Sequence, residues 1–172
     1  MKIPTDKTVY IARGVVYQDM GNHSFAIKDF NSALEIDSEL SEAFFRRGVS
    51  KLYSKNFHDA INDFNAAFRN EEAEEDKRNH GIPDGLGCCY HALKETDKAI
   101  EYYNDAVKGD PSNVEFLMHR SQCYYDLKDF DKSVDDLKQG LMIKNDDAQV
   151  HYRLGLTHYA DGNFKKCVES LK

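Results

Sequence analysis

The feature that most constrains the fold of this chain is an internal repeat. Gly14 recurs 34 residues later as Gly48, and Phe30 recurs at the same interval as Phe64. Self-similarity at a fixed interval of roughly 20–50 residues is typical of arrays in which each unit buries its apolar face against the next unit. The chain is therefore expected to fold as a stack of similar units rather than around one central core.

Within each unit, the apolar residues follow helical rather than alternating spacing. The first such set in the first unit is Val9, Tyr10, Gly14, Val16 and Tyr17. Gly21 and Asn22 interrupt the pattern, and these residue types favour the end of one helix and the start of the next. The second set is Phe25, Ala26, Ile27, Phe30, Ala33 and Leu34. The pattern predicts an all-α fold in which every unit is an antiparallel helix pair.

The interval divides the chain into a lead-in and five units. The predicted boundaries are 1–6, 7–40, 41–79, 80–113, 114–147 and 148–172. The charged run 71–79, EEAEEDKRN, is predicted to lengthen the second helix of the second unit, because its residues are good helix formers; an acidic docking site is the alternative. Pro83 predicts a late start for the next helix. The last unit stops inside its second helix, which favours a fragment of a longer protein over a chain whose end frays.

Small residues return at fixed places, although a glycine inside a helix costs roughly 1 kcal/mol relative to alanine. The first helices carry Gly14, Gly48, Gly87, Ser121 and Gly155. The second helices carry Ala26, Ala60, Ala99, Ser133 and Cys167, with the bulky residues Phe30, Phe64, Tyr103, Leu137 and Leu171 four positions later. Large residues are predicted to fill the gaps that small residues leave between closely packed helices.

Composition excludes several classes of protein. The formal net charge is −7, without a basic stripe, which argues against nucleic-acid binding. No apolar run approaches the roughly 18 residues of a membrane span, and residues 1–10 lack the apolar core of a secretory signal. The cysteines lack C-x-x-C spacing, so buried thiols are expected rather than disulfides or zinc; they are Cys88, Cys89, Cys123 and Cys167. We expect a cytoplasmic protein in a reducing compartment.

The repeated residues resemble the tetratricopeptide repeat (TPR) family. The first unit matches the family pattern at Tyr10, Gly14, Tyr17, Ala26, Phe30 and Ala33, and the third unit matches it at Leu86, Gly87, Tyr90, Ala99, Tyr103, Ala106 and Pro111. The terminal proline of the pattern is replaced by Ser38, Glu72 and Asn145 in three units. The resemblance implies an α-solenoid, a right-handed superhelix whose concave groove holds a peptide or helix of a partner protein.

The resemblance also implies that the groove is lined mainly by the first helix of each pair, at positions that the core does not use. The predicted partner-binding residues are Phe45, Arg46, Val49, Tyr53, His91, Met118, His119, Gln122, Tyr125, Tyr152, Arg153 and Tyr159. This set is aromatic and locally basic, and such residues often anchor partners. It suits a partner segment with acidic and apolar side chains; the alternative is that several of these residues are part-buried spacers between helices.

The carboxylate clamp of chaperone-binding TPR proteins is absent from the predicted groove. That clamp needs lysine, asparagine and arginine at set positions of three successive first helices. The corresponding positions hold Ile11, Val15, Arg46, Gly81 and Gly85, or, when the frame starts at the third unit, Asp84, Cys88, His119, Gln149 and Arg153. We therefore predict a partner that is not held by such a clamp.

The sequence gives little support for catalysis, and no cofactor is predicted. His151 and His158 lie seven residues apart, but they occupy the positions of Tyr10 and Tyr17, so packing is favoured over metal binding. No G-x-S-x-G, H-E-x-x-H or phosphate loop occurs. The predicted function is a non-catalytic protein-interaction scaffold. The alternative is a structural spacer or self-association domain of a larger multi-domain protein, whose terminal units stack on another copy at residues such as Tyr159 and Leu171.

Overall fold

Helices separated by short turns make up the described part of the computed structural model, which covers residues 6–71 and 79–171. The ten helices fall into two compact units, Met1–Leu93 and Lys94–Lys172. The first unit contains α1 (Lys7–Asp19), α2 (His23–Ile36), α3 (Ser41–Tyr53), α4 (Phe57–Arg69) and α5 (Gly81–Ala92). The second contains α6 (Thr96–Gly109), α7 (Val114–Asp126), α8 (Phe130–Ile143), α9 (Ala148–Ala160) and α10 (Phe164–Ser170).

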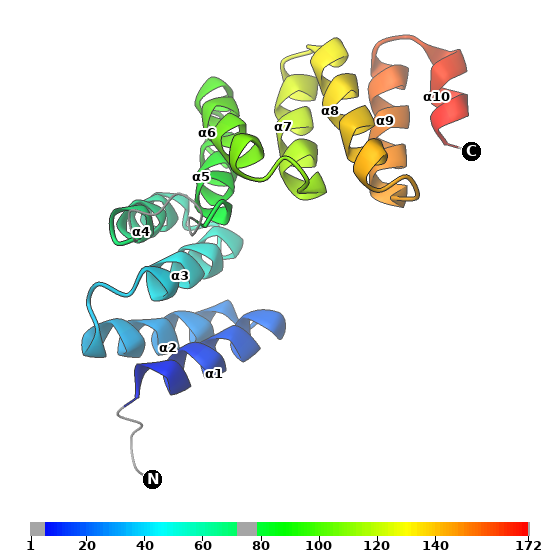
Figure 1. The fold of residues 1–172 in the computed structure, drawn as a ribbon. Coiled ribbons are helices and arrows are strands. Elements are labelled where there is room, and N and C mark those ends of the chain that lie inside the picture. The colour runs from blue at the N-terminus through cyan, green and yellow to red at the C-terminus, as the bar shows by residue number, and fades with distance from the viewer. Residues whose placement is uncertain (1–5, 72–78, 172) are drawn as a thin grey trace. The chain divides into compact units, whose positions relative to one another are not determined.

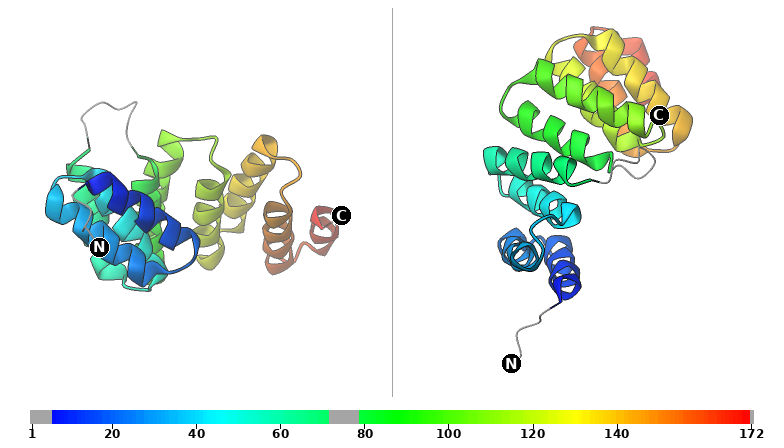
Figure 2. Two further views of the ribbon diagram at one scale, coloured as in Figure 1. Left: turned by 90° about the horizontal axis from the view of Figure 1, so that it is seen from below. Right: turned by 60° about the vertical axis from the view of Figure 1, so that its left-hand side comes forward.

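Helices that follow one another within a unit lie side by side (Figure 1). In the first unit, α1 packs on α2, α2 on α3, α3 on α4 and α4 on α5, and in the second unit the same order runs from α6 to α10. The two further views in Figure 2 show the short turns that connect antiparallel neighbours. The predicted all-α fold of antiparallel helix pairs is confirmed; there are about five pairs, and the last helix is short.

The turn inside each pair has one backbone position with positive φ. It is occupied by Gly21, Lys55, Lys94, Lys128 and Gly162, with φ between 61° and 78°. In four of these turns its N–H donates to a carbonyl three residues back: Gly21 to Gln18, Lys55 to Leu52, Lys128 to Tyr125 and Gly162 to Tyr159. This left-handed residue closes the first helix and reverses the chain. The sequence revealed the position only where it carries glycine, because lysine is not a usual sign of this conformation.

Phe64 shows how the large residues of the second helices pack against the small residues of the first helices. Its side chain is fully buried. A Cβ atom placed on Gly48 of α3 would lie 3.0 Å from Phe64 Cε1, and one placed on Gly85 of α5 would lie 2.5 Å from Phe64 Cζ. The Phe64 ring of α4 therefore occupies space that is open only because the two neighbouring helices carry glycine, which has no side chain, at these positions.

Two predictions about helix ends have different outcomes. Pro83 lies in the first turn of α5, which has 12 residues against 13 for the other first helices. The late start is thus confirmed. The prediction that residues 71–79 lengthen the second helix of the second unit is wrong, because α4 already ends at Arg69. The N–H of Asn70 donates there to the carbonyls of Ala66 and Ala67. Residues 72–78 lie outside the described part of the chain.

Besides Phe25 of α2, which is 51% exposed, residues that the apolar pattern assigns to packing are exposed on α1 and α10. Val9 and Val16 of α1 are 46% and 55% exposed, and Leu171 is 55% exposed although its side chain lies against Gly155. These residues sit on the outermost helices of the two units. Their equivalents elsewhere in the chain are covered by a neighbouring helix.

Candidate functional site

Three arginines that directly precede the small residue of a first helix form ion pairs with buried carboxylates. Arg13, Arg47 and Arg120 each donate two hydrogen bonds to a carboxylate 16 residues later, on Asp29, Asp63 and Asp136 respectively. The donor–acceptor distances lie between 2.6 and 2.9 Å, and all three carboxylates are buried. The pairing raises the pKa of Arg120, chiefly through its hydrogen bonds to Asp136.

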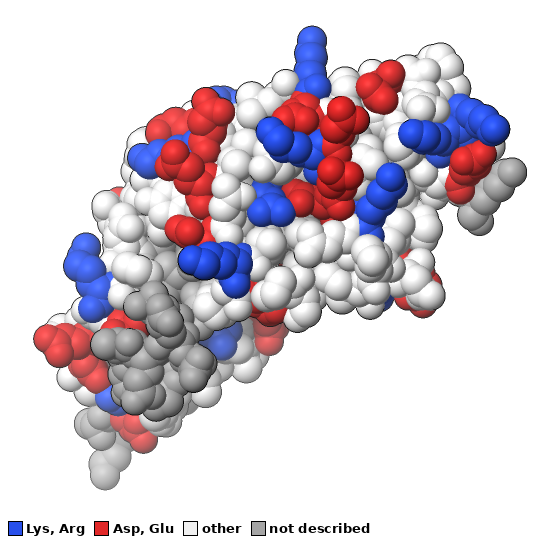
Figure 3. All heavy atoms as spheres, turned by 45° about the horizontal axis from the view of Figure 1, so that its top comes forward, with Lys and Arg blue, Asp and Glu red and all other residues white. Residues whose placement is uncertain are grey.

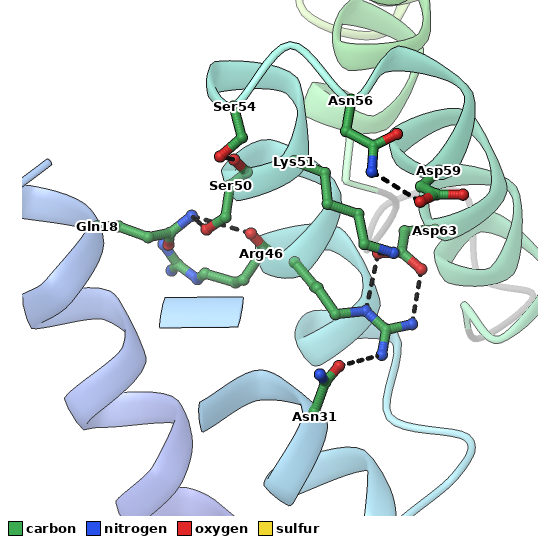
Figure 4. Close-up of polar contacts among 10 residues, drawn as sticks. Gln18, Asn31, Arg46, Ser50, Lys51, Ser54, Asn56, Asp59 and Asp63 are labelled. Carbon is green, nitrogen blue, oxygen red and sulfur yellow. Dashed lines mark hydrogen bonds and ion pairs between the residues drawn. The ribbon is translucent and has the colours of Figure 1, made fainter. Parts of the chain in front are cut away.

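Two of these arginines also bridge to the preceding helix pair. Arg47 Nη1 donates to Asn31 Oδ1 at 2.6 Å, and Arg120 Nη1 donates to Asn104 Oδ1 at 2.9 Å. Figure 4 shows Asn31 and Asp63 on opposite sides of this contact, with Lys51 also reaching Asp63. This network was not predicted from the sequence, although the interval of 16 residues between arginine and aspartate was a visible signal.

In the first unit, the predicted residues Phe45 and Arg46 line an open hollow of about 660 Å³. Arg46 lies 3.5 Å from Glu42, and the other acidic side chains that line the hollow are Asp37, Glu39 and Glu71. Gln18 fixes the backbone here, because its amide donates to the carbonyl of Arg46 and to Ser50 Oγ (Figure 4). An acidic ligand would meet several carboxylates in this hollow.

The other predicted residues of the first unit lie outside that hollow. Tyr53 is exposed, and its ring stacks on His23 with the ring centroids 5.1 Å apart. Val49 and His91 are partly buried. The structure therefore brings together only Phe45 and Arg46 from this part of the predicted set.

In the second unit, three predicted residues converge on one cavity of about 140 Å³. Gln122, Tyr125 and Arg153 line it together with Ser121, Ser133, Leu137, Leu156 and Thr157. Arg153 Nη1 donates to Gln122 Oε1 at 2.7 Å, and Gln122 Nε2 donates to Asp126 at 2.9 Å. The cavity is smaller than the roughly 300–1,000 Å³ of small-molecule sites, so its size suits a single side chain.

Arg153 differs from the three arginines that pair with buried carboxylates. No carboxylate within residues 6–71 and 79–171 forms an ion pair with it, and its guanidinium donates to the neutral amide of Gln122. The side chain of Arg153 is partly buried. A partly buried guanidinium with no carboxylate beside it is a ready site for an anionic group.

Four further predicted residues are not among those that line the cavity. Tyr152 and Tyr159 are 59% and 62% exposed on α9, and the Tyr159 ring packs edge-on against Phe164. Met118 packs at the margin of the core formed by Leu137, Val150 and Leu154, while the His119 ring lies 5.8 Å from the ring of Tyr103. Met118 and His119 therefore do not line the cavity.

The two histidines of the last pair have separate surroundings. His158 is buried, and this burial lowers its pKa, with Lys166 and Lys138 adding to the effect. His151 places its two ring nitrogens 2.9 Å from the carbonyl oxygen of Asn145 and 3.2 Å from that of Ser170. His158 thus occupies a packing position, as the register predicts.

None of the four cysteines forms a disulfide. Cys89 and Cys123 are buried, whereas Cys88 and Cys167 are partly buried, so the buried-thiol prediction holds fully for two of the four. Burial raises the pKa of Cys89 to about 12. Such a thiol is almost entirely protonated near neutral pH and is therefore a poor nucleophile.

Charges of both signs cover the surface. Figure 3 shows Lys and Arg side chains interspersed with Asp and Glu on one face of the described residues. Among the helices of the described residues, none has both the length and the apolar character that crossing a lipid bilayer would require.

Comparison with known proteins gives the family. The pattern described as "Tetratricopeptide repeat" matches residues 8–40 and 85–113, and the pattern described as "TPR repeat" matches residues 122–162. Together these matches cover more than half of the chain. The chain belongs to the tetratricopeptide repeat family. TPR domains generally serve as protein–protein interaction modules, and their fold is typically non-catalytic.

Individual relatives of this TPR chain are distant. DnaJ homolog subfamily C member 3 of Rattus norvegicus is 21% identical over 179 residues, which cover 98% of this chain and 36% of that protein. Hsp70-Hsp90 organizing protein of Triticum aestivum is 21% identical over 168 residues, which cover 98% of this chain and 26% of that protein. The chain thus spans about a third or less of the length of these curated relatives.

The fold is also similar to that of a solved TPR structure. The crystal structure described as "YrrB: a TPR protein with an unusual peptide-binding site" aligns with a TM-score of 0.71 at 20% identity. The alignment covers 96% of this chain and 83% of that chain. Similarity at this level of identity supports the shared fold alone.

Proposed function

We propose that this TPR chain is a non-catalytic scaffold that binds a segment of a partner protein along its first helices. In this proposal, the cavity at Arg153 takes an acidic side chain of that segment. The observation that carries the proposal is the contrast among the arginines. Arg13, Arg47 and Arg120 are each neutralised by an aspartate, whereas Arg153 contacts a neutral amide at the edge of a cavity.

A carboxylate entering the cavity would gain charge-assisted hydrogen bonds from Arg153. A planar guanidinium can bind a carboxylate through two parallel N–H···O contacts, and such bonds are about twice as strong as neutral ones. The partly buried position of Arg153 limits screening by solvent. Gln122 currently holds the side chain in place and could also donate to the ligand.

Apolar side chains around the cavity supply the rest of the proposed contact area. Leu156 and Tyr125 line it, and Tyr152 and Tyr159 are exposed on the same helix as Arg153. Tyrosine offers a large contact surface at a low cost in conformational entropy. The proposed ligand therefore carries an acidic residue flanked by apolar residues.

The relatives are compatible with this proposal without naming the partner. The YrrB structure is described by its peptide-binding site, and the curated relatives include an Hsp70-Hsp90 organizing protein. The positions of the carboxylate clamp in this chain do not carry the clamp residues, so we propose a partner that is recognised through an internal acidic segment. We further propose that the protein works in the cytoplasm.

Selection from a random peptide display library tests this function. Wild-type protein is the bait, and Arg153→Gln is the counter-selection bait. The proposal expects enriched peptides that carry Asp or Glu beside apolar residues and that Arg153→Gln does not retain. Lys138→Gln is the matched control, because it removes one positive charge from an exposed position on α8. Enrichment of peptides without acidic residues, or equal retention by Arg153→Gln, would contradict the proposal.

The exposed apolar surface of the last pair favours a second candidate function, self-association. Phe164, Val168 and Leu171 are each more than half exposed at the end of the second unit. If this surface joins copies of the chain, sedimentation will show concentration-dependent dimers that disappear on polar substitution of Tyr159 and Leu171. A monomer at all concentrations would rule this function out.

A further inference from the structure

Two positions on the first helix of each pair are buried in every pair except the first. Relative to the small residue, they lie five positions before and two positions after it. The earlier position is 0–7% exposed at Ala43, Ile82, Phe116 and Val150, and the later one is 0–2% exposed at Ser50, Cys89, Cys123 and Thr157. At α1 the same positions hold Val9 and Val16, which are 46% and 55% exposed. Two apolar side chains thus stand in solvent where their equivalents lie in the core.

The later pairs show what normally covers these positions. The second helix of the preceding pair packs on the first helix of the next: α2 on α3, α4 on α5, α6 on α7 and α8 on α9. Small residues make the contact, since Ala33 clusters with Ala43, and Ala106 clusters with Phe116. In α2 and α6 the covering helix therefore presents an alanine to the earlier position.

The covering helix also provides a polar contact to the arginine before the small residue. Asn31 of α2 accepts a hydrogen bond from Arg47, and Asn104 of α6 accepts one from Arg120. The side chains of Arg47 and Arg120 are 18% and 17% exposed, whereas that of Arg13 is 50% exposed. Arg13 is bonded to Asp29 like its equivalents, but its outer side faces solvent.

We propose that the outer face of α1, defined by Val9, Arg13 and Val16, binds an amphipathic helix of a partner protein. The helix carries the pattern Ala-x-x-x-aromatic-Asn-x-Ala. The chain contains this pattern in α2 as AIKDFNSA, in α4 as AINDFNAA and in α6 as AIEYYNDA. On α1, the alanines would cover the two valines, and the asparagine would accept a hydrogen bond from Arg13. This site is separate from the cavity at Arg153, so the two proposals can fail independently.

A second copy of this chain is a poor occupant of the α1 face. The alanines of α2, α4 and α6 are already buried against their own neighbours, as Ala33, Ala67 and Ala106 show. In the last repeat, Cys167 takes the place of the first alanine of this pattern and Leu171 that of the aromatic residue. Lys172 then stands in the place of the asparagine. A lysine opposite Arg13 would be repelled rather than bonded.

The test uses a peptide from the chain itself as the probe. A fluorescent peptide with the α6 sequence, Thr96–Gly109, is held helical by a covalent side-chain staple, because isolated helices of this length are marginal in water. Its binding to the full chain is followed by fluorescence anisotropy. We expect Val9→Gln/Val16→Gln to weaken binding at least tenfold, a change of about 1.4 kcal/mol. Changing Asn104→Lys in the peptide should weaken binding at least fivefold.

The control variant Met142→Gln/Ile143→Gln removes exposed apolar side chains from α8 and should bind the peptide like the wild type. The two valine sites and the two control sites are all exposed. The melting temperatures of both variants should therefore equal that of the wild type. Failure of the peptide to bind at about 1 mM would overturn the proposal. Equal binding by the valine variant would do the same, as would wild-type dimers that this variant abolishes, since the occupant would then be a second copy.

Discussion

The guanidinium of Arg47 donates a hydrogen bond to each carboxylate oxygen of Asp63, from Nε at 2.8 Å and from Nη2 at 2.7 Å. The two residues belong to α3 and α4, so the contact ties the two helices of one pair. Arg47 also reaches Asn31 of the preceding pair. One arginine thus links three helices, and the same arrangement recurs at Arg120 with Asp136 and Asn104.

Asp63→Ala should destabilise the chain by about 3 kcal/mol, because it leaves Arg47 and Lys51 without their shared buried carboxylate. Urea denaturation measures the loss. The matched control is Arg47→Leu/Asp63→Tyr, which copies the residues Leu86 and Tyr102 that the third repeat has at these places. This double variant should lose less stability than Asp63→Ala, since it leaves only Lys51, and not Arg47 as well, without the buried carboxylate. A double variant that is less stable than Asp63→Ala would show that the pair itself stabilises the fold.

Two glycine substitutions should change stability in opposite directions. Gly85→Ala would place a Cβ 2.5 Å from the buried ring of Phe64, and such overpacking costs about 1–3 kcal/mol. Gly140→Ala would place its Cβ 3.4 Å from Val114 and 3.7 Å from Val150, an ordinary contact. The gain in helix propensity should then stabilise the chain by up to about 1 kcal/mol. Thermal melts of both variants check the signs, and a stabilising Gly85→Ala would contradict the packing at Phe64.

Stability should fall as the pH drops from about 7.5 to 5.5, partly because of His158. Burial lowers its pKa in the folded protein, whereas in the unfolded chain the pKa is about 6.5. Below that value the unfolded state binds the proton more readily than the folded state, so protonation favours unfolding. The contribution of His158 is therefore present above pH 6.5 and is lost as the pH falls toward its folded pKa.

His158→Tyr should reduce this pH dependence, since tyrosine occupies the same register at Tyr17, Tyr90 and Tyr124. Melting temperatures across the pH range give the comparison. The remaining histidines and carboxylates are common to both proteins, so the difference between the two slopes reports on His158. Identical slopes would mean that His158 is as easily protonated in the folded protein as in the unfolded chain.

The repeat was predictable because its packing residues recur at fixed intervals. Gly48 and Phe64 could be paired from the sequence, and the structure places them in contact. The exposure of Val9 and Val16 was not predictable from the same pattern, because a register assigns a residue to an interface without showing whether the neighbouring helix is present. The end of α4 at Arg69 was missed because helix propensity says nothing about the bonds that terminate a helix.

The candidate site was predicted less completely than the fold. Gln122, Tyr125 and Arg153 were assigned to the partner-binding surface, and the structure gathers them at one cavity. Met118 and His119 lie against other side chains, because a position that the core pattern does not use can still be covered by a neighbouring helix. The difference between Arg153 and the paired Arg120 depends on contacts between helices, which the repeat pattern does not encode.

The most direct test of the proposed function is a calorimetric titration of an acidic peptide from the display selection into wild type, Arg153→Gln and Lys138→Gln. Losing a charge-assisted hydrogen bond costs about 1.5–3 kcal/mol, so Arg153→Gln should weaken binding about 10- to 100-fold. Lys138→Gln should bind within about twofold of wild type, because an exposed charge contributes little. Equal affinity of wild type and Arg153→Gln for the peptide would contradict the assignment of the Arg153 cavity as the partner-binding site.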